Sequence, residues 1–233
     1  MTLLKRSAAF LAATIVALVA GNAAAQLAAP KLVRPDVLMS TLTADVLTVL
    51  KDDAAAGRAT DVAFLVDTKI LPVFDFAHMT RIAMARNWRL ASAQQQAALT
   101  TQFRTLFARS YSSALSSYRD EAIEYKPLRF AAGETDVLVR SVMRRRGAEP
   151  LTIDYDMELT PAGWKVYDVK IAGVSLVLNY RESFATAVRT GGIDGLIQML
   201  SDKNRNNQAN QRHEPAGKLA PLLLIYTGGR PRG

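Results

Sequence analysis

The chain has 233 residues, no cysteine and a formal net charge of +8 at pH 7. Without cysteine the protein has no disulfide, no Cys/His metal cluster and no thiol nucleophile, so its stability must come from a buried core. Lys5 and Arg6 supply two of the positive charges, and residues 205–233 supply five basic side chains and one acidic one. Residues 26–204 therefore carry a net charge of only +2, which argues against nucleic-acid binding by this part of the chain.

The N-terminus has the order of a secretory signal peptide. The basic pair Lys5 and Arg6 precedes an apolar run from Ala8 to Ala20 and then small residues that end at Ala25. A helix that spans a bilayer needs about 20 apolar residues, and Gly21 interrupts this run well before that length. We therefore expect residues 1–25 to be a signal peptide that directs export and is cleaved after Ala25.

Three helices are predicted before residue 92. Apolar residues recur at helical spacing from Pro35 to Leu50, and Gly57 follows the end of this pattern. A second helix is expected from Thr60, as its N-cap, to Leu71, where Pro72 removes a backbone donor and ends it. A third is expected to begin at Asp75.

The longest predicted helix begins at Ser92 and continues to Tyr118. Ser92 and Gln95 have the spacing of a capping box, in which each side chain bonds the other residue's backbone N–H. One face carries an apolar and largely aromatic stripe with a period of 3.6 residues, and the opposite face is polar. The stripe consists of Leu99, Phe103, Leu106, Phe107, Tyr111, Ala114, Leu115 and Tyr118.

After Tyr118 the apolar period changes to two, which is typical of β-strands. Short turns separate the strands, so consecutive strands should pair in an antiparallel meander. The predicted class is α+β, with a four-stranded antiparallel curved meander sheet covered by N-terminal and C-terminal helices that enclose an apolar cavity. The strand candidates are Ala122–Phe130, Thr135–Arg145, Leu151–Leu159 and Trp164–Leu178.

Two helices and a tail are predicted after the strands. Asn179 is expected to cap a helix that ends at Gly191 and Gly192, and a short helix follows from Ile193 to Asp202. Residues 26–204 then form a single domain, and residues 205–233 form a mostly disordered tail. An alternative is that the short apolar segment Leu222–Tyr226 packs on the folded domain.

Few residues suggest catalysis. His78 lies three residues after Asp75 at a helix start, where capping is the simpler explanation. Asp154, Asp156 and Asp168 could lie close together across neighbouring strands, as a general acid and base would need. Asp154 and Asp156 are explained more simply as the solvent-facing residues of a strand whose apolar residues alternate with polar ones. The segment Gly191–Gly195 follows a predicted helix rather than a strand, so its glycines are expected to end that helix and not to form a phosphate-binding loop.

A basic run at a predicted hairpin tip leaves two interpretations open. Arg144, Arg145 and Arg146 precede Gly147, where the strand is expected to end. The run is either a solvated turn or a site for phosphate head groups or an acidic partner, since arginine matches paired oxygen atoms well.

From about Asp75 to Asn204 the sequence resembles the MlaC family, the periplasmic phospholipid-binding component of the Mla lipid-asymmetry pathway, whose relatives are also called toluene-tolerance auxiliary proteins. The resemblance departs after Asn204, where relatives generally stop soon. It is carried by short blocks in family order: Phe74-Asp75-Phe76 with Met79, Asn87-Trp88-Arg89, Phe103 to Tyr118, Ile153-Asp154-Tyr155, Gly163 to Val169, Gly173 to Val177, Asn179-Tyr180-Arg181 and Gly192 to Ile197.

The resemblance implies a periplasmic, monomeric carrier that is not an enzyme, uses no cofactor or metal, and holds phospholipid as its cargo. It also implies two partners, an outer-membrane lipoprotein complex and an inner-membrane ABC transporter with a substrate-binding subunit. Acyl chains need an apolar, poorly hydrated cavity. The expected lining consists of Phe103, Phe107, Tyr111, Leu115 and Tyr118 from the long helix, Val139, Ile153, Tyr155 and Val169 from the strands, and Val177 and Phe184 beyond them.

Two other functions remain open from the residues alone. A small-molecule enzyme could be built from a cone-shaped α+β fold if Asp154 or Asp168 faced inward. A polyanion binder would use the basic run from Arg144 to Arg146, but the nearly neutral body argues against it.

Overall fold

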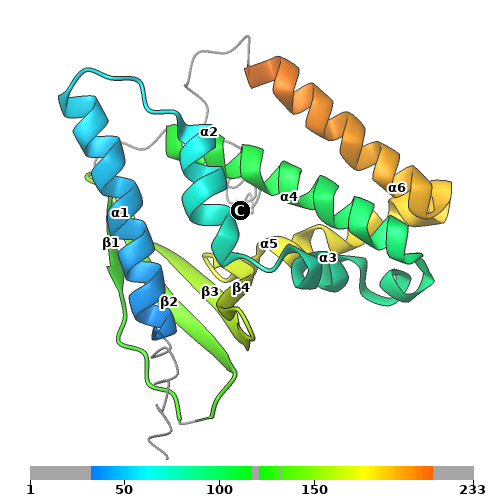
Figure 1. Cartoon of the computed structure of the whole chain (residues 1–233), viewed down its shortest axis with the longest axis horizontal. Helices are drawn as coiled ribbons and strands as arrows, with labels where there is room; N and C mark the ends of the chain where they lie inside the picture. Colours follow the sequence, from blue (N-terminus) through cyan, green and yellow to red (C-terminus); the bar gives the residue numbers. More distant parts are fainter. Residues whose placement is uncertain (1–32, 117–120, 132, 212–233) are drawn as a thin grey trace, which may run out of the picture. The chain divides into compact units, whose positions relative to one another are not determined.

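An antiparallel sheet and a set of helices that pack on it form the structure, a computed structural model that describes residues 33–116, 121–131 and 133–211 (Figure 1). The strands follow one another in chain order across the sheet, as a meander requires. Within the described residues the strands are β1 (Ala122–Tyr125), β2 (Asp136–Arg144), β3 (Leu151–Thr160), β4 (Gly163–Ile171) and β5 (Val174–Ser175).

The sheet has five strands where four were predicted, because the last predicted strand, Trp164–Leu178, turns back on itself. Ala172 and Gly173 both have positive φ, 49° and 80°, so the chain reverses after β4. Val174 and Ser175 then pair with Ile171 and Lys170 as β5, and the chain enters a helix. The α+β class and the antiparallel meander are confirmed.

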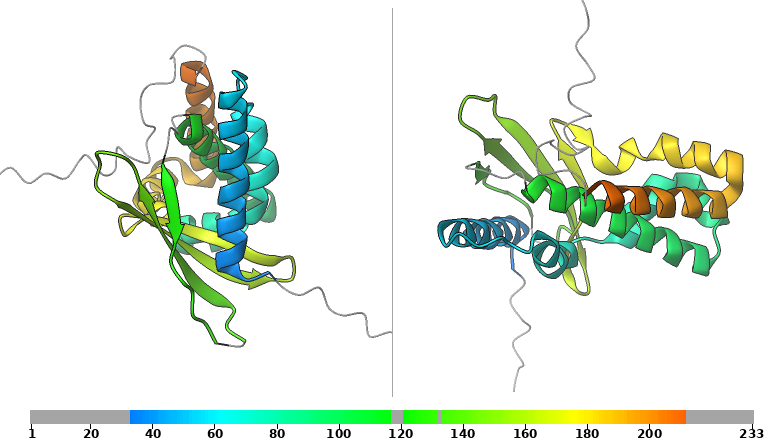
Figure 2. Two further views of the ribbon diagram at one scale, coloured as in Figure 1. Left: turned by 90° about the vertical axis from the view of Figure 1, so that its left-hand side faces the viewer. Right: turned by 90° about the horizontal axis from the view of Figure 1, so that it is seen from above.

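The helices occupy most of the remaining described residues. Helix α1 packs against β1 and β2, α3 and α5 pack against β4, and α4 packs against α6 (Figures 1 and 2). No helix in the described ranges combines the length and apolar character needed to cross a membrane. The helices are α1 (Pro35–Ala55), α2 (Val62–Leu65), α3 (Phe76–Met84), α4 (Ala93–Ser116), α5 (Leu176–Asn179) and α6 (Arg181–Gln211).

The second predicted helix is correct in position but wrong in its cap and in its regularity. Asp61 rather than Thr60 caps it, since the Asp61 carboxylate accepts a hydrogen bond from the backbone N–H of Phe64 at 3.0 Å. After α2 the chain passes through a π turn (Val66–Ile70) and a 3-10 turn (Leu71–Val73) that contains Pro72. The proline cannot donate to a continuing α-helix, so the hydrogen-bond pattern changes before it.

The predicted caps of the next two helices are confirmed. Asp75 accepts from the backbone N–H of His78 at 2.8 Å at the start of α3. Ahead of α4, the backbone N–H of Gln95 donates to the Ser92 hydroxyl, and the backbone N–H of Ser92 donates to the Gln95 side chain. The capping box of Ser92 and Gln95 fixes where α4, and hence its aromatic stripe, begins.

The C-terminal region consists of two helical segments that meet at a sharp break at Gly192, as predicted, but the second segment continues to Gln211 rather than ending at Asp202. At Gly192 φ is 68° and ψ is −170°, so the axis changes direction there (Figure 2). The predicted boundary at residue 204 falls inside α6, which continues to Gln211. Asn204 is buried and its side-chain amide donates to Gln102, which ties this part of the helix to α4. The predicted signal peptide, residues 1–25, and residues 212–233 of the predicted tail lie outside the described residues.

Gly192 offers a test of the kink. Its backbone conformation is one that only glycine adopts readily, while a Cβ built there meets no atom within 4 Å. We expect Gly192→Ala to lower the free energy of unfolding by about 1–3 kcal/mol through backbone strain alone. Gly191→Ala is the matched control, because it also has open space but no positive φ, and it should be neutral or stabilising. Equal unfolding midpoints in urea for the two variants would contradict this assignment.

Candidate functional site

The inner face of the sheet carries a continuous apolar row. Val139 on β2 lies opposite Tyr155 on β3, which in turn lies opposite Val169 on β4. These three predicted site residues are 0%, 5% and 1% exposed. Ile153, also predicted, occupies the next row between Ser141 and Ile171. The alternation of the strands therefore brings the four strand residues together on one face.

Helix α4 brings further predicted residues to this region. The rings of Phe107 and Tyr111 stack with their centroids 4.9 Å apart. Phe74 contacts both rings, at 4.8 Å and 6.1 Å, and so links α4 to the segment before α3. One turn beyond Tyr111, Leu115 packs on the same core. Phe107, Tyr111 and Leu115 thus share one helix face, as their spacing predicted.

Three tyrosine hydroxyl groups meet between α4 and the sheet. Burial raises the pKa of Tyr111, Tyr125 and Tyr155, and the three side chains perturb one another. The rings of Tyr125 and Tyr155 are stacked at 6.4 Å, and the Tyr125 hydroxyl pairs with the Thr43 hydroxyl of α1 at 2.6 Å. All three phenols are therefore neutral at physiological pH.

Several of these side chains are deep but not fully covered. Tyr111 lies deep enough for burial to raise its pKa strongly, yet part of its surface remains uncovered by neighbouring atoms. Tyr125 has the same combination, and Leu115 and Ile153 are likewise only partly buried although they pack on the core. In a close-packed interior such side chains would have no uncovered surface.

Three other predicted residues lie among the helices, within the same hydrophobic core. Phe103 packs edge-to-face against Phe184 of α6 at 5.6 Å and against Tyr180 at 5.1 Å. Phe103 and Phe184 are fully buried, as is Val177 of α5. This group has the character of an ordinary core. Tyr118, the last predicted residue of the stripe, lies outside the described residues.

Two residues of the sheet-facing group were not among the predicted ones. Tyr125 lies on β1 opposite Ser141, and Thr43 lies on the inner side of α1. The alternation of Ile123 and Tyr125 with charged neighbours was a signal that could have identified the first. Nothing in the sequence could have identified Thr43, because its role depends on how α1 crosses the sheet.

Two surface cavities are described, and neither contains a predicted site residue. A groove of about 700 Å³ lies beside the end of α5 and along α6, between Asn179 and Met199, and Gly191 and Gly195 are among its lining residues. The other cavity, of about 460 Å³, lies beside the connection from β1 to β2, between Lys126 and Arg140.

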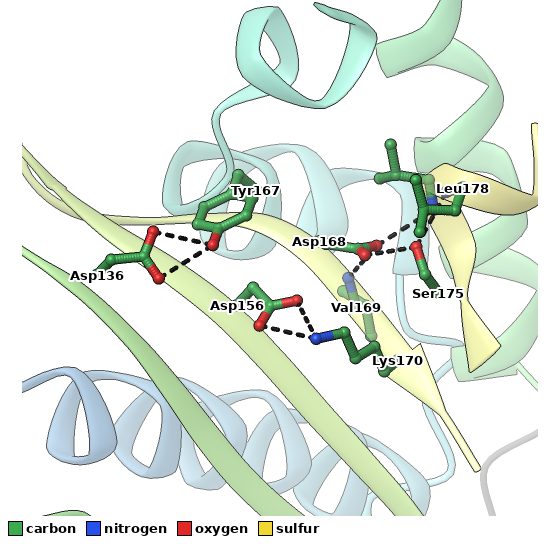
Figure 3. A network of polar contacts seen from close by, with 9 residues as sticks. Asp136, Asp156, Tyr167, Asp168, Val169, Lys170, Ser175 and Leu178 are labelled. Atoms are coloured by element: carbon green, nitrogen blue, oxygen red, sulfur yellow. Dashed lines mark hydrogen bonds and ion pairs between the residues drawn. The ribbon is translucent and has the colours of Figure 1, made fainter. Parts of the chain in front are cut away.

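Asp168 is a buried carboxylate at the junction of β4 and α5 (Figure 3). One of its oxygen atoms accepts from the backbone N–H groups of Val169, at 2.8 Å, and Val177, at 3.2 Å. The other accepts from the Ser175 hydroxyl at 2.5 Å, and the Ser175 oxygen caps α5 by accepting from the N–H of Leu178. Desolvation raises the pKa of Asp168, and these hydrogen bonds partly offset the rise. The carboxylate thus joins the sheet to the helices.

The other carboxylates lie on the outer face of the sheet. Asp156 pairs with Lys170 at 2.7 Å, and Asp136 accepts a hydrogen bond from the Tyr167 hydroxyl (Figure 3). Asp154 stands on the same outer face, opposite Arg140 and Lys170 in neighbouring strands. The acidic side chains that alternate with apolar ones along β3 therefore lie on the outer face of the sheet, as the sequence predicted. Asp154 does not face inward.

His78 takes part in the capping of α3 through its backbone N–H, which Asp75 accepts, while its side chain has other partners. The ring Nδ1 pairs with Glu158 at 2.5 Å, and the ring stacks on Tyr167 at 4.6 Å. These contacts fasten α3 to the outer face of the sheet. Within the described ranges no cluster of three histidine or acidic side chains could hold a metal ion.

The basic run lies at the end of β2, as predicted, and Gly147 turns there with φ of 74°. Arg144 pairs with Glu124 at 3.3 Å, and Arg145 pairs with Glu121 at 3.9 Å. Glu124 belongs to β1 and Glu121 is the residue before it, so these two arginines form ion pairs along the edge of the sheet.

Comparison with known proteins gives consistent matches. The model of the MlaC protein family matches residues 40–202. A solved structure, the phospholipid-binding protein from Ralstonia solanacearum in complex with a phospholipid, is 39% identical, with a TM-score of 0.68, over 76% of this chain and 99% of that chain.

Two curated relatives are more distant in sequence. The intermembrane phospholipid transport system binding protein MlaC of Haemophilus influenzae is 22% identical over 139 residues, which cover 58% of this chain and 65% of the relative, slightly under two thirds of its length. The toluene tolerance protein ttg2D of Pseudomonas putida is 25% identical over 162 residues, which cover 68% of this chain and 74% of the relative.

The environment of Asp168 predicts a pH dependence of stability. Because its pKa is raised in the folded state, the folded protein binds this proton more tightly than the unfolded chain does. Its contribution to stability is therefore greatest below the unfolded pKa of about 3.9 and falls as the pH rises through the folded pKa. We expect Asp168→Asn, which keeps the shape but cannot ionise, to reduce this fall in the free energy of unfolding, measured by urea denaturation from about pH 4 to pH 7.

The exposed Asp45 of α1 provides the matched control, since Asp45→Asn removes the same charge from a solvated position. It should leave the pH profile of the wild-type protein unchanged. A profile for Asp168→Asn that declines as steeply as that of the wild type would contradict the assignment.

Proposed function

The chain belongs to the MlaC protein family, and on that premise we propose that it is a carrier that binds a phospholipid by its acyl chains and moves it between membranes. The resemblance inferred from short sequence blocks is thereby confirmed at the level of the family. Members of this family are lipid-binding transport proteins rather than enzymes, so the prediction of a non-catalytic protein is confirmed too.

One observation carries the proposal for this chain. Tyr111 and Leu115 of α4 and Ile153 of β3 all pack on the hydrophobic core, yet each retains uncovered surface. Such surface is expected where side chains border a hollow rather than fill a core. Val139, Tyr155 and Val169 extend this proposed lining across the sheet, and Phe103, Phe107, Val177 and Phe184 back it from the helices.

A hollow of this kind suits a carrier on energetic grounds. Burial of a methylene contributes about 0.8 kcal/mol, so the roughly 30 methylenes of two acyl chains represent about 24 kcal/mol relative to water. A bilayer offers the same chains a nearly equal environment. Transfer between membrane and protein is therefore close to balanced, while release into water is strongly disfavoured.

The alternative of an enzyme is not supported. It required Asp154 or Asp168 to face a substrate pocket, but Asp154 lies on the outer face of the sheet. Both Asp168 oxygens are engaged by Ser175, Val169 and Val177. Its raised pKa follows from its place at a structural junction.

The proposed setting is the periplasm, reached through the N-terminal signal peptide. The proposed partners are an outer-membrane lipoprotein complex and an inner-membrane ABC transporter with its substrate-binding subunit, between which the monomeric carrier shuttles. The name of the Haemophilus relative, a binding protein of an intermembrane phospholipid transport system, supports this role. We also propose that head groups protrude from the lining, so that several phospholipid species are accepted, and strict head-group selectivity would contradict this.

The proposal predicts that lipid copurifies with the protein. The full chain, exported by its own N-terminal segment and purified without detergent, should yield about one phospholipid per protein after organic extraction and mass spectrometry. Tyr111→Glu should lower this occupancy at least about tenfold, because it places a charge against the acyl chains.

The matched control is Thr101→Glu, which adds the same charge on the exposed face of the same helix and should leave occupancy unchanged. Circular dichroism should establish that both variants are folded. Recovery of lipid-free wild-type protein, or full occupancy in a folded Tyr111→Glu variant, would contradict the proposal.

A further inference from the structure

The cavity beside the connection from β1 to β2, called here the connection cavity, has a distinctive set of charges. Its volume is about 460 Å³, and the basic side chains of Lys126, Arg129 and Arg140 line it. Two acidic residues, Glu134 and Asp136, line it as well. The kind of ligand that suits this cavity therefore depends on which of these charges the protein already neutralises.

The two carboxylates of the connection cavity are engaged by other groups. The Tyr167 hydroxyl donates to the Asp136 carboxylate and lies 3.1 Å and 2.9 Å from its two oxygens. The Glu134 carboxylate accepts from the backbone N–H of Ala131 at 2.6 Å, within the turn that leads to β2. Among the described residues, neither carboxylate forms an ion pair with a basic side chain of the cavity.

The three basic side chains, in contrast, have no counter-charge. Lys126, Arg129 and Arg140 are exposed, and within the described ranges none of them forms an ion pair or a side-chain hydrogen bond. Asp154 lies opposite Arg140 on β3, but these two side chains are not paired. Of the basic run that the sequence offered as a phosphate site, Arg144 is neutralised by an ion pair, whereas the cations of the connection cavity are not.

Two of these cations stand directly opposite each other on neighbouring strands. The backbone N–H of Lys126 donates to the Arg140 carbonyl at 2.8 Å, which continues the register of Tyr125 and Ser141 by one residue. Because Tyr125 and Ser141 face the inner side of the sheet, Lys126 and Arg140 share the outer face. Like charges in this cross-strand position repel each other and destabilise the sheet. An anion bound between them would remove this repulsion.

The wall that carries Arg129 is held in place by contacts with the start of α1 and with β4 (Figure 1). Arg34, which precedes α1, donates to the Leu128 carbonyl at 2.9 Å, and its guanidinium lies over the Phe130 ring at 5.1 Å. The Phe130 ring also packs edge-to-face against Trp164 at 6.0 Å. Both neighbours of Arg129 are thus fixed, so the connection cavity is part of the folded structure.

We propose that the connection cavity binds a phosphate group between Lys126, Arg129 and Arg140. A phosphate group presents oxygens in several directions and can accept from three cations at once, whereas the two oxygens of a carboxylate match a single arginine fork. The phosphate group is carried either by a free phosphate ester or by the head group of an anionic phospholipid at a membrane surface. The proposal goes beyond the carrier function and does not rest on it, since no residue of the proposed acyl-chain lining lines this cavity.

The proposal predicts saturable binding of phosphate at this place. The full chain, exported by its own N-terminal segment, is titrated with inorganic phosphate at constant ionic strength while its backbone amide shifts are followed by NMR. We expect the shifts to concentrate in residues 126–140. Arg140→Gln should lower the affinity at least about tenfold, because it removes a charge-assisted hydrogen bond. Arg144→Gln is the matched control, since it removes the same charge from a paired position on the same strand and should leave the affinity unchanged.

Flotation with phosphatidylglycerol liposomes distinguishes the two sources of the phosphate group. Weaker flotation of Arg140→Gln than of Arg144→Gln would assign the site to a lipid head group, because the two variants have the same net charge and the same unspecific attraction to the membrane. Equal flotation of the two variants, together with saturation by inorganic phosphate, would assign the site to a free phosphate ester.

Three results would overturn the inference. They are an absence of saturable shifts in the wild-type protein, an unchanged phosphate affinity in folded Arg140→Gln, and tighter binding of a hexaglutamate peptide than of phosphate at the same residues. The last result would assign the cavity to an acidic segment of a protein partner instead. Copurification of phospholipid is measured separately, so none of these results bears on the carrier function.

Discussion

The helices keep a fixed position over the sheet because β4 and α5 meet at Asp168, whose buried carboxylate bonds Ser175 and the backbone of Val169 and Val177. A buried carboxylate is costly, and it is tolerated here because both oxygen atoms are engaged. The contact sets the start of α5 and hence of α6. Since α4 packs against α6, the aromatic stripe of α4 is positioned over the sheet through the same junction.

This arrangement separates two kinds of apolar packing. Between α4 and α6, Phe103 and Phe184 meet edge-to-face and are fully covered, as expected of a core that supplies stability. Between α4 and the sheet, Tyr111 and Ile153 remain partly uncovered. A carrier needs both regions, because the close-packed one holds the molecule together while the proposed hollow receives cargo without unfolding the rest.

The sequence predicted those features that depend on local patterns. Strand alternation placed Val139, Tyr155 and Val169 on one face, and the capping box at Ser92 fixed the start of α4. The turn at Ala172, the π turn after α2 and the pairing of Thr43 with Tyr125 depend on contacts between distant segments, so no local pattern identified them. The spacing of the α4 stripe likewise could not distinguish Phe103, which lies in the helical core, from Tyr111, which faces the sheet.

The edge strand β4 is protected by segments that belong to no long strand. Phe74 forms a parallel bridge with Val166, and the backbone N–H of Asp75 donates to the Val166 carbonyl at 2.9 Å. Farther along the same edge, β5 pairs with Lys170 and Ile171. An uncovered row of backbone donors and acceptors is a template for intermolecular sheet growth. By closing β4 at both ends with short pieces of its own chain, the protein removes this edge of the sheet as a template for β-rich aggregation.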